Sequence, residues 1–121
     1  MKRITTPEAR RYVEQRIPFK NSNGSCYGCW LSYTFSHDGA PEERQFVVSS
    51  YGRHFPMFIY HEPSGQWFGN KDKWSRTTSK HKGYTQPHGV QIEWRDNATM
   101  REIANNGLAG AVRKQFRGAV S

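Results

Sequence analysis

Residues 45–70 read QFVVSSYGRHFPMFIYHEPSGQWFGN and predict three consecutive β-strands. The runs 45–51, 55–61 and 66–70 are rich in Val, Ile, Phe, Tyr and Trp, which favour strands. A glycine at position 52 and the segment EPSG at 62–65 separate these runs, and such residues are typical of tight turns. Short strands joined by tight turns form an antiparallel meander. This stretch therefore predicts the centre of a β-sheet.

Two more strands and two helices are predicted around this meander. Residues 27–36 alternate, with Tyr27, Cys29 and Leu31 on one side and Trp30 on the other, and residues 89–96 alternate in the same way. A helix is predicted over 6–16, and a last helix follows a cap at Asp96 or Asn97. We therefore expect an α+β fold, with a small twisted antiparallel sheet of about five strands and both terminal helices packed on one face. A length of 121 residues predicts a single domain over 1–121.

The chain is strongly basic, and its charge is clustered. Its net charge is +8, from 18 Lys and Arg against 10 Asp and Glu. Residues 70–82 hold five basic residues and one acidic residue, while residues 1–16 and 101–121 each carry a net charge of +3. Clustered positive charge favours an anionic partner such as nucleic acid or an acidic protein surface.

The segment KDKWSRTTSKHK at 71–82 is the main candidate for binding an anion. We interpret it as a loop, in which Lys, Arg, Ser and Thr supply the donors that contact phosphates and aromatic rings could stack on bases. The structural alternative is a polar loop whose hydroxyl groups cap the backbone and whose tryptophan packs on the core. The predicted binding residues are Lys71, Lys73, Trp74, Arg76, Thr77, Thr78, Ser79, Lys80, His81 and Lys82, together with Arg113, Lys114 and Arg117 near the C-terminus and with help from Arg10 and Arg11.

Two cysteines form a CxxC motif that could bind a metal or act as a dithiol. Cys26 and Cys29 have the spacing of a metal knuckle, but a structural zinc needs two further ligands and the five histidines lack the usual paired spacing. The motif runs into a predicted strand, whereas a redox motif sits where a strand meets a helix. The interpretation is that Cys29 is a small core residue. We expect no cofactor and no metal.

Sequence motifs of catalysis are missing from the chain. There is no phosphate-binding loop and no dinucleotide fingerprint. Ser79 and His81 are neighbours in sequence, which does not by itself make a nucleophile and its base. The protein is therefore predicted not to be an enzyme, with a hydrolase or a transferase as the remaining enzymatic alternative.

The central segment resembles a family of small proteins encoded mainly by bacteriophages, whose domain has no assigned function. The matching positions are Phe46, Val47, Val48, Ser50, Tyr51 and Gly52, then Pro56, Trp67, Asn70 and Lys73, and the run from Trp74 to His81. The resemblance covers about residues 17–82. Trp74 stands where the family more often has Tyr, and the CxxC is outside the family's pattern. The resemblance implies a phage-type context and carries no activity.

The predicted function is a non-enzymatic, basic accessory protein of phage type that binds nucleic acid through residues 71–82 and the basic helix ends. The alternative is an inhibitor that binds and blocks a host protein, such as a nucleic-acid-guided defence complex, in the manner of an anti-CRISPR protein. The N-terminus lacks an apolar signal segment, and no apolar run approaches the length of a membrane span. We therefore expect a cytoplasmic protein, in the host cytoplasm if phage-encoded, with no membrane contact and no small-molecule substrate.

Overall fold

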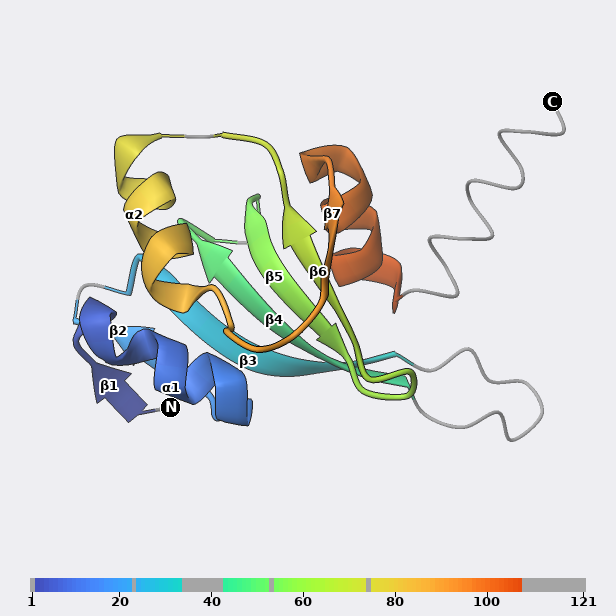
Figure 1. The fold of residues 1–121 in the computed structure, drawn as a ribbon, viewed down its shortest axis with the longest axis horizontal. Coiled ribbons are helices and arrows are strands. Elements are labelled where there is room, and N and C mark those ends of the chain that lie inside the picture. Colours follow the sequence, from blue (N-terminus) through green and yellow to red (C-terminus); the bar gives the residue numbers. More distant parts are fainter. Residues whose placement is uncertain (1, 23, 34–42, 53, 74, 108–121) are drawn as a thin grey trace, which may run out of the picture.

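The computed structural model describes residues 2–22, 24–33, 43–52, 54–73 and 75–107, which form an α+β fold around a seven-stranded mixed sheet (Figure 1). The prediction of about five antiparallel strands is therefore wrong. The strands lie in the sheet in chain order. They are β1 (Lys2–Ile4), β2 (Phe19–Asn21), β3 (Cys26–Tyr33), β4 (Glu43–Ser50), β5 (Pro56–His61), β6 (Gln66–Asn70) and β7 (Ile92–Arg95).

The central part of the sheet is the predicted antiparallel meander. Strands β2 to β6 pair antiparallel with their neighbours, and β6 covers the predicted residues 66–70. The two edge strands are parallel to their neighbours, since β1 pairs with β2 and β7 pairs with β6. β1 and β2 are not among the predicted strands, because each has only three residues, too few to show an alternating pattern.

Each parallel pair of strands is connected by a helix on the same face of the sheet. The short 3₁₀ helix η1 (Thr6–Glu8) and α1 (Ala9–Gln15) join β1 to β2, and α2 (Arg76–Thr85) joins β6 to β7. Four antiparallel pairings separate β2 from β6, so the two β–helix–β units point the same way and step across the sheet in the same sense. The strong preference for right-handed crossovers then places both helices on one face. The contacts between α1 and α2 agree with this.

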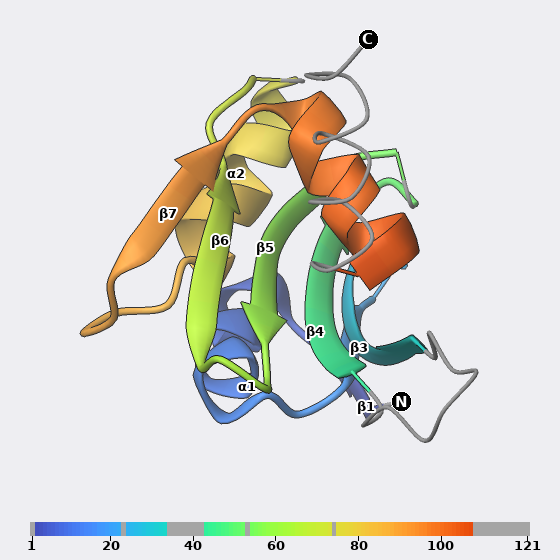
Figure 2. The same ribbon diagram turned by 90° about the vertical axis from the view of Figure 1, so that its right-hand side faces the viewer.

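The opposite face of the sheet is covered by the helical residues 97–107 (Figure 2). Met100, Ile103 and Ala104 of this segment pack against apolar side chains of β4, β5 and β6. The Thr99 amide donates to Asp96 Oδ1 at 2.9 Å, which confirms the predicted cap at Asp96. The prediction that both terminal helices share one face is therefore wrong. A central sheet with two apolar faces needs a layer on each side, and α1 and α2 already occupy one of them.

The larger hydrophobic core lies between the sheet and α1. It is rich in aromatic rings, with Phe19, Phe46, Phe55 and Phe58 almost completely buried. Trp30 packs against this core from β3, whereas Leu31 packs on the opposite core beside the helical residues 97–107. Both faces of β3 are therefore partly covered. None of the described helices is both long enough and apolar enough to cross a membrane.

The predicted loop at 71–82 is largely a helix, because α2 begins at Arg76. Ser75 caps it, and its hydroxyl accepts a hydrogen bond from the Thr78 amide at 3.1 Å. The buried positions Thr78, His81 and Thr85 have the spacing of one helix face, but all three are polar. A search for an apolar stripe could not find this helix. The capping serine and the spacing of these three residues were the available signals.

Candidate nucleic-acid interface

The inner face of α2 is held on the sheet by a chain of buried hydroxyl groups. Ser50 at the end of β4 lies 3.0 Å from Thr78 Oγ1 and 2.8 Å from His81 Nδ1. The Ser75 hydroxyl donates to Thr78 Oγ1, so Thr78 can donate to Ser50 and Ser50 to the imidazole. This order requires an unprotonated Nδ1. Burial lowers the pKa of His81 and so favours the neutral ring that the chain needs.

The segment that leads into α2 is fixed by a second polar cluster. Asn70 is completely buried at the end of β6, and its amide donates to Pro56 O at 3.0 Å and to Asn97 Oδ1 at 2.9 Å. Its own oxygen accepts from the Asp72 amide, and Asp72 Oδ2 accepts from the Asn97 amide at 2.8 Å. The start of the basic segment is therefore tied to the start of the helical residues 97–107.

These two clusters place the predicted residues in two groups. Thr78 and His81 are interior supports of α2 and present no side chain to a partner. Lys82 is half-buried, donates to Asp72 O at 3.2 Å and lies over the Trp94 ring at 6.0 Å. Burial lowers the pKa of Lys82, while the charge of Asp72 raises it and that of Lys73 lowers it. Lys82 therefore belongs to the packing beneath the helix more than to its outer surface.

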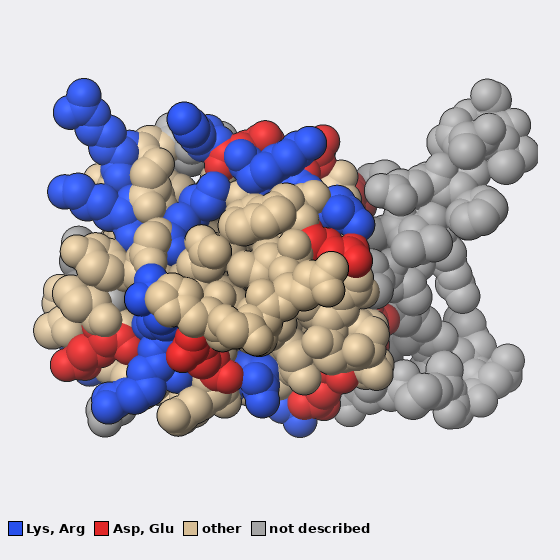
Figure 3. Space-filling model, viewed as in Figure 1, with Lys and Arg blue, Asp and Glu red and all other residues tan. Residues whose placement is uncertain are grey.

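The remaining predicted binding residues of the segment that the structure describes are all exposed. We call this set of residues the α2 surface, and it consists of Lys71, Lys73, Arg76, Thr77, Ser79 and Lys80. α2 itself contains no acidic residue. Figure 3 shows Lys and Arg over α2 at the upper left, and further Lys and Arg beside Asp and Glu at the top centre and along the lower part of the view. Tyr84, which is 43% exposed, follows Arg76 and Lys80 at successive spacings of four residues, so all three lie along one stripe of the helix.

Of the basic residues predicted to help from the two ends of the chain, the structure describes Arg10 and Arg11 of α1. Arg10 of α1 donates to the backbone oxygens of Gln86 and Gly83, where its positive charge also offsets the negative C-terminal end of α2. Arg11 is exposed on α1 and lies over the Tyr12 ring. The helical residues 97–107 lie on the other face of the sheet, away from α2. Trp74, Arg113, Lys114 and Arg117 lie outside the described residues.

The two cysteines face opposite sides of β3. Cys26 is completely buried in the core beside α1, and burial raises the pKa of its thiol to about 12. Cys29 is half-buried and points to the other face, because residues three apart in a strand lie on opposite sides. The two sulfur atoms therefore cannot bind one metal ion while β3 remains extended. Among the described residues, no group of three His, Cys, Asp or Glu is arranged to hold a metal. Cys29, predicted to be a small core residue, is only half-buried, whereas Cys26 is fully buried.

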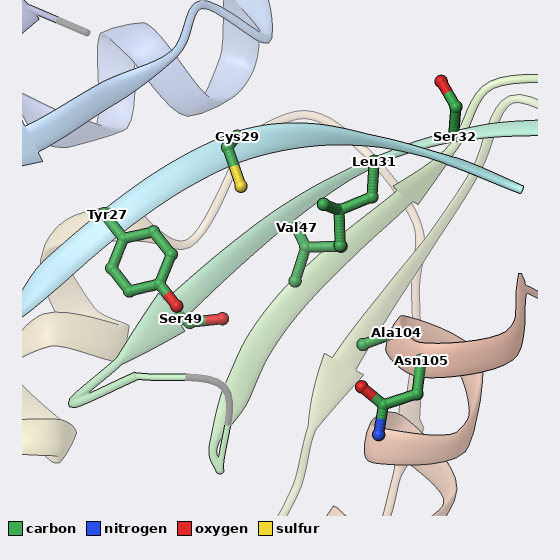
Figure 4. A pocket seen from close by; sticks show the side chains of 8 residues that line it. All are labelled: Tyr27, Cys29, Leu31, Ser32, Val47, Ser49, Ala104 and Asn105. Atoms are coloured by element: carbon green, nitrogen blue, oxygen red, sulfur yellow. The ribbon is translucent and has the colours of Figure 1, made fainter.

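Cys29 lines a cavity of about 340 Å³ between the sheet and the helical residues 97–107. Figure 4 shows Cys29 and Val47 projecting from the strands on the same side as Ala104 and Asn105 of the helical segment. The described lining contains no carboxylate, imidazole or cationic side chain. The cavity therefore has no described group of those kinds to act as a general base.

One set of side chains in the β5–β6 turn has the order of a nucleophile, a base and a carboxylate. The Ser64 hydroxyl lies 2.7 Å from His61 Nδ1, and His61 Nε2 lies 2.8 Å from Glu43 Oε1. The backbone amide groups that could stabilise an oxyanion are already used, since Gly65 N–H donates to two carbonyl groups and Gln66 N–H donates to Ser64 Oγ. We therefore interpret this set as a structural link that closes the hairpin.

Sequence analysis missed an aromatic groove of about 580 Å³ on the same face of the sheet as α1 and α2. Tyr60 of β5 and the almost fully buried Trp67 of β6 line it with ring centroids 5.1 Å apart. Arg16, which ends α1, holds its guanidinium 4.6 Å from the centre of the Tyr60 ring. Tyr60 and Trp67 pair across one hairpin, but Arg16 is more than forty residues from either, so no local pattern could have indicated the complete groove.

No protein-family model, curated protein or solved structure matches this chain. The resemblance of residues 17–82 to a phage-encoded family therefore stays a prediction. Four of its motif positions, Ser50, Asn70, Thr78 and His81, are buried and hydrogen-bonded around α2. In this structure they support the α2 surface from beneath.

Proposed function

We propose that this protein is a non-enzymatic nucleic-acid-binding protein whose α2 surface contacts the phosphate backbone. The observation that carries the proposal is the separation of roles within residues 71–82. The polar residues Thr78 and His81 are used internally, and the four cations Lys71, Lys73, Arg76 and Lys80 are left exposed together.

The chemistry of the α2 surface suits phosphate. Lys and Arg side chains neutralise phosphates, and the exposed hydroxyl groups of Thr77 and Ser79 can donate hydrogen bonds between them. Two acidic side chains near this segment accept backbone amides: Asp72 accepts from Asn97, and Asp96 accepts from Thr99 at the cap of the next helical segment. The hydrogen bonds from Thr99 lower the pKa of Asp96, and the positive charge of Lys71 lowers it further, so Asp96 also attracts one cation of the α2 surface. Contacts to phosphates carry no sequence information, so nucleic-acid binding should not depend on the base sequence.

Salt dependence tests the proposal quantitatively. Each neutralised phosphate contributes about 0.7–0.9 to the slope of log affinity against log salt concentration. Four contacts therefore predict a slope of about −3, and affinity should fall roughly a hundredfold between 50 and 200 mM salt. The measurement is a fluorescence-anisotropy titration of a labelled oligonucleotide at several salt concentrations, with both single-stranded and double-stranded forms.

A matched pair of variants assigns the binding to α2. Arg76→Ala should flatten the salt slope by about 1 and weaken binding to every sequence alike. Arg101→Ala removes the same charge from an exposed position in the helical residues 97–107, on the other face of the sheet, and should leave the slope unchanged. The triple variant of Lys71, Arg76 and Lys80 to alanine should abolish most of the salt dependence.

Equal effects of Arg76→Ala and Arg101→Ala would show that only net charge matters and would refute a specific α2 surface. Absence of nucleic-acid binding by the wild-type protein at low salt would refute the proposed function. Recovery of a single acidic host protein in a nuclease-treated pull-down, together with that absence, would favour the inhibitor alternative.

A further inference from the structure

The aromatic groove has features of a site for a flat ring. Arg16 lies over the half-buried Tyr60 ring, Trp67 is tilted against that ring by 49° and is 4% exposed, and Gln66, Gln91 and Glu93 also line the groove. Glu93 is paired with Arg95 at 2.7 Å. The described lining therefore offers a guanidinium plane over one aromatic ring, with hydrogen-bonding residues around it and little net charge.

Arg16, which lines the groove, has a backbone conformation that is unusual for a residue other than glycine. Its φ angle is 55°, in the left-handed region that residues other than glycine seldom adopt. Its carbonyl accepts a hydrogen bond from the Trp30 indole at 3.1 Å, and its guanidinium is stacked on Tyr60. An arginine at a position that favours glycine is consistent with a role for its side chain.

One wall of the groove is fixed in place before any ligand arrives. Val90 and Gln91 belong to the segment 86–91, which connects α2 to β7. This segment is held at one end by Arg10 on Gln86 O and by the Glu14 carboxylate, which accepts from the His88 amide at 2.7 Å. At the other end Ile92 pairs with Trp67 in the sheet. Figure 1 shows the segment crossing the same face of the sheet that carries α1 and α2.

We propose that the aromatic groove binds an unpaired nucleobase of a single-stranded nucleic acid whose phosphates lie on the α2 surface. This inference rests on the proposed function and adds a preference for single strands. Bases in protein complexes stack on aromatic rings and on arginine planes, and glutamine amides pair with base edges. The only cation in the described lining, Arg16, donates to the Glu14 carbonyl and lies flat over Tyr60, which suits stacking of an uncharged ring, whereas the α2 surface suits the anionic backbone.

The experiment compares two oligonucleotides with identical backbones, a twelve-nucleotide oligothymidine and its abasic counterpart. Stacking of one base predicts that wild-type protein binds the oligothymidine at least about fivefold more tightly. Arg16→Gly suits the left-handed backbone and removes the guanidinium, so it should fold normally and lose this preference. It should retain nearly the wild-type affinity for the abasic strand.

The control variant is Lys80→Ala, which should weaken binding of both oligonucleotides by the same factor. A second measurement uses adenosine, an uncharged nucleoside, and follows backbone amide chemical shifts. Saturable shifts should appear at Gln66 and Gln91 in wild-type protein and disappear in Arg16→Gly.

Each outcome decides the matter. If wild-type protein binds both oligonucleotides equally and Lys80→Ala weakens both, the proposed function stands and the base site is refuted. If Arg16→Gly keeps the preference for oligothymidine, the groove is not the base site. If wild-type protein binds neither oligonucleotide, the proposed function and this inference both fail.

Discussion

Replacing Ser50 with alanine should destabilise the protein and detach α2 from the sheet. Ser50, Thr78 and His81 are all buried, with 4% or less of each residue exposed. The change removes the hydrogen bonds of the Ser50 hydroxyl to Thr78 at 3.0 Å and to His81 at 2.8 Å. It leaves His81 Nδ1 buried without its hydrogen-bond partner Ser50. A buried unsatisfied group costs about 1–3 kcal/mol, and a lost hydrogen bond about 0.5–1.5 kcal/mol.

The expected loss in the free energy of unfolding is therefore about 2–4 kcal/mol. For a domain of this size, about 4 °C in Tm corresponds to each kcal/mol, so Tm should fall by about 8–16 °C. The measurements are urea unfolding followed by circular dichroism and hydrogen exchange of the α2 amides. The α2 amides should lose protection before those of β4 and β5, because only the helix loses its support.

Ser79→Ala is the matched control for this prediction. Ser79 is on the exposed side of the same helix, so the same chemical change should alter stability by no more than about 0.5 kcal/mol. Equal stability of Ser50→Ala and Ser79→Ala would refute the idea that the buried hydroxyl chain holds α2 in place.

Three further predictions concern stability and reactivity. Because burial lowers the pKa of His81 below its ordinary 6.5, the folded state binds that proton less readily than the unfolded state. The contribution of the neutral ring to the free energy of unfolding should therefore be fully present above about pH 6.5 and decline as pH falls toward the folded-state pKa. His81→Gln should flatten this part of the pH profile, measured by urea titrations. Gly83→Ala, at an open position within α2, should stabilise the protein by up to about 1 kcal/mol. Gly69→Ala would place a methyl group 2.7 Å from side chains of β7 and should destabilise the protein by about 1–3 kcal/mol. Thermal unfolding that ranks these two variants in the reverse order would contradict the described packing. Near neutral pH, iodoacetamide should modify Cys29 in the native protein and Cys26 only after denaturation, as mass spectrometry of peptides would show, because the Cys26 thiol is buried and its pKa is raised to about 12.

The meander from β4 to β6 could be predicted because its evidence is local. Strand residues alternate with turn residues over short distances, and antiparallel neighbours joined by tight turns follow from that order. The edge strands could not be predicted in the same way. β1 is held by pairing with β2 across the intervening α1, and β7 is held by β6 across α2. Their register depends on contacts distant in sequence.

The composition of residues 71–82 determined that a dense group of cations and hydroxyl groups would lie on one segment. It did not determine which of them face outward. Only the packing of α2 against Ser50 decided that Thr78 and His81 are internal and that Arg76 and Lys80 are exposed. A helix whose buried stripe is polar becomes stable only when tertiary partners satisfy its hydroxyl and imidazole groups.

By itself, the sequence determined an α+β protein of high positive charge with an aromatic, antiparallel centre. The tertiary structure alone decided that helices cover both faces of the sheet, that Cys26 and Cys29 point apart, and that Arg16 meets Tyr60 and Trp67 in one groove. The physical reason is the range of the interactions. Alternation, turns and caps act over a few residues, whereas sheet pairing, crossover handedness and buried hydrogen bonds join residues that the chain holds far apart.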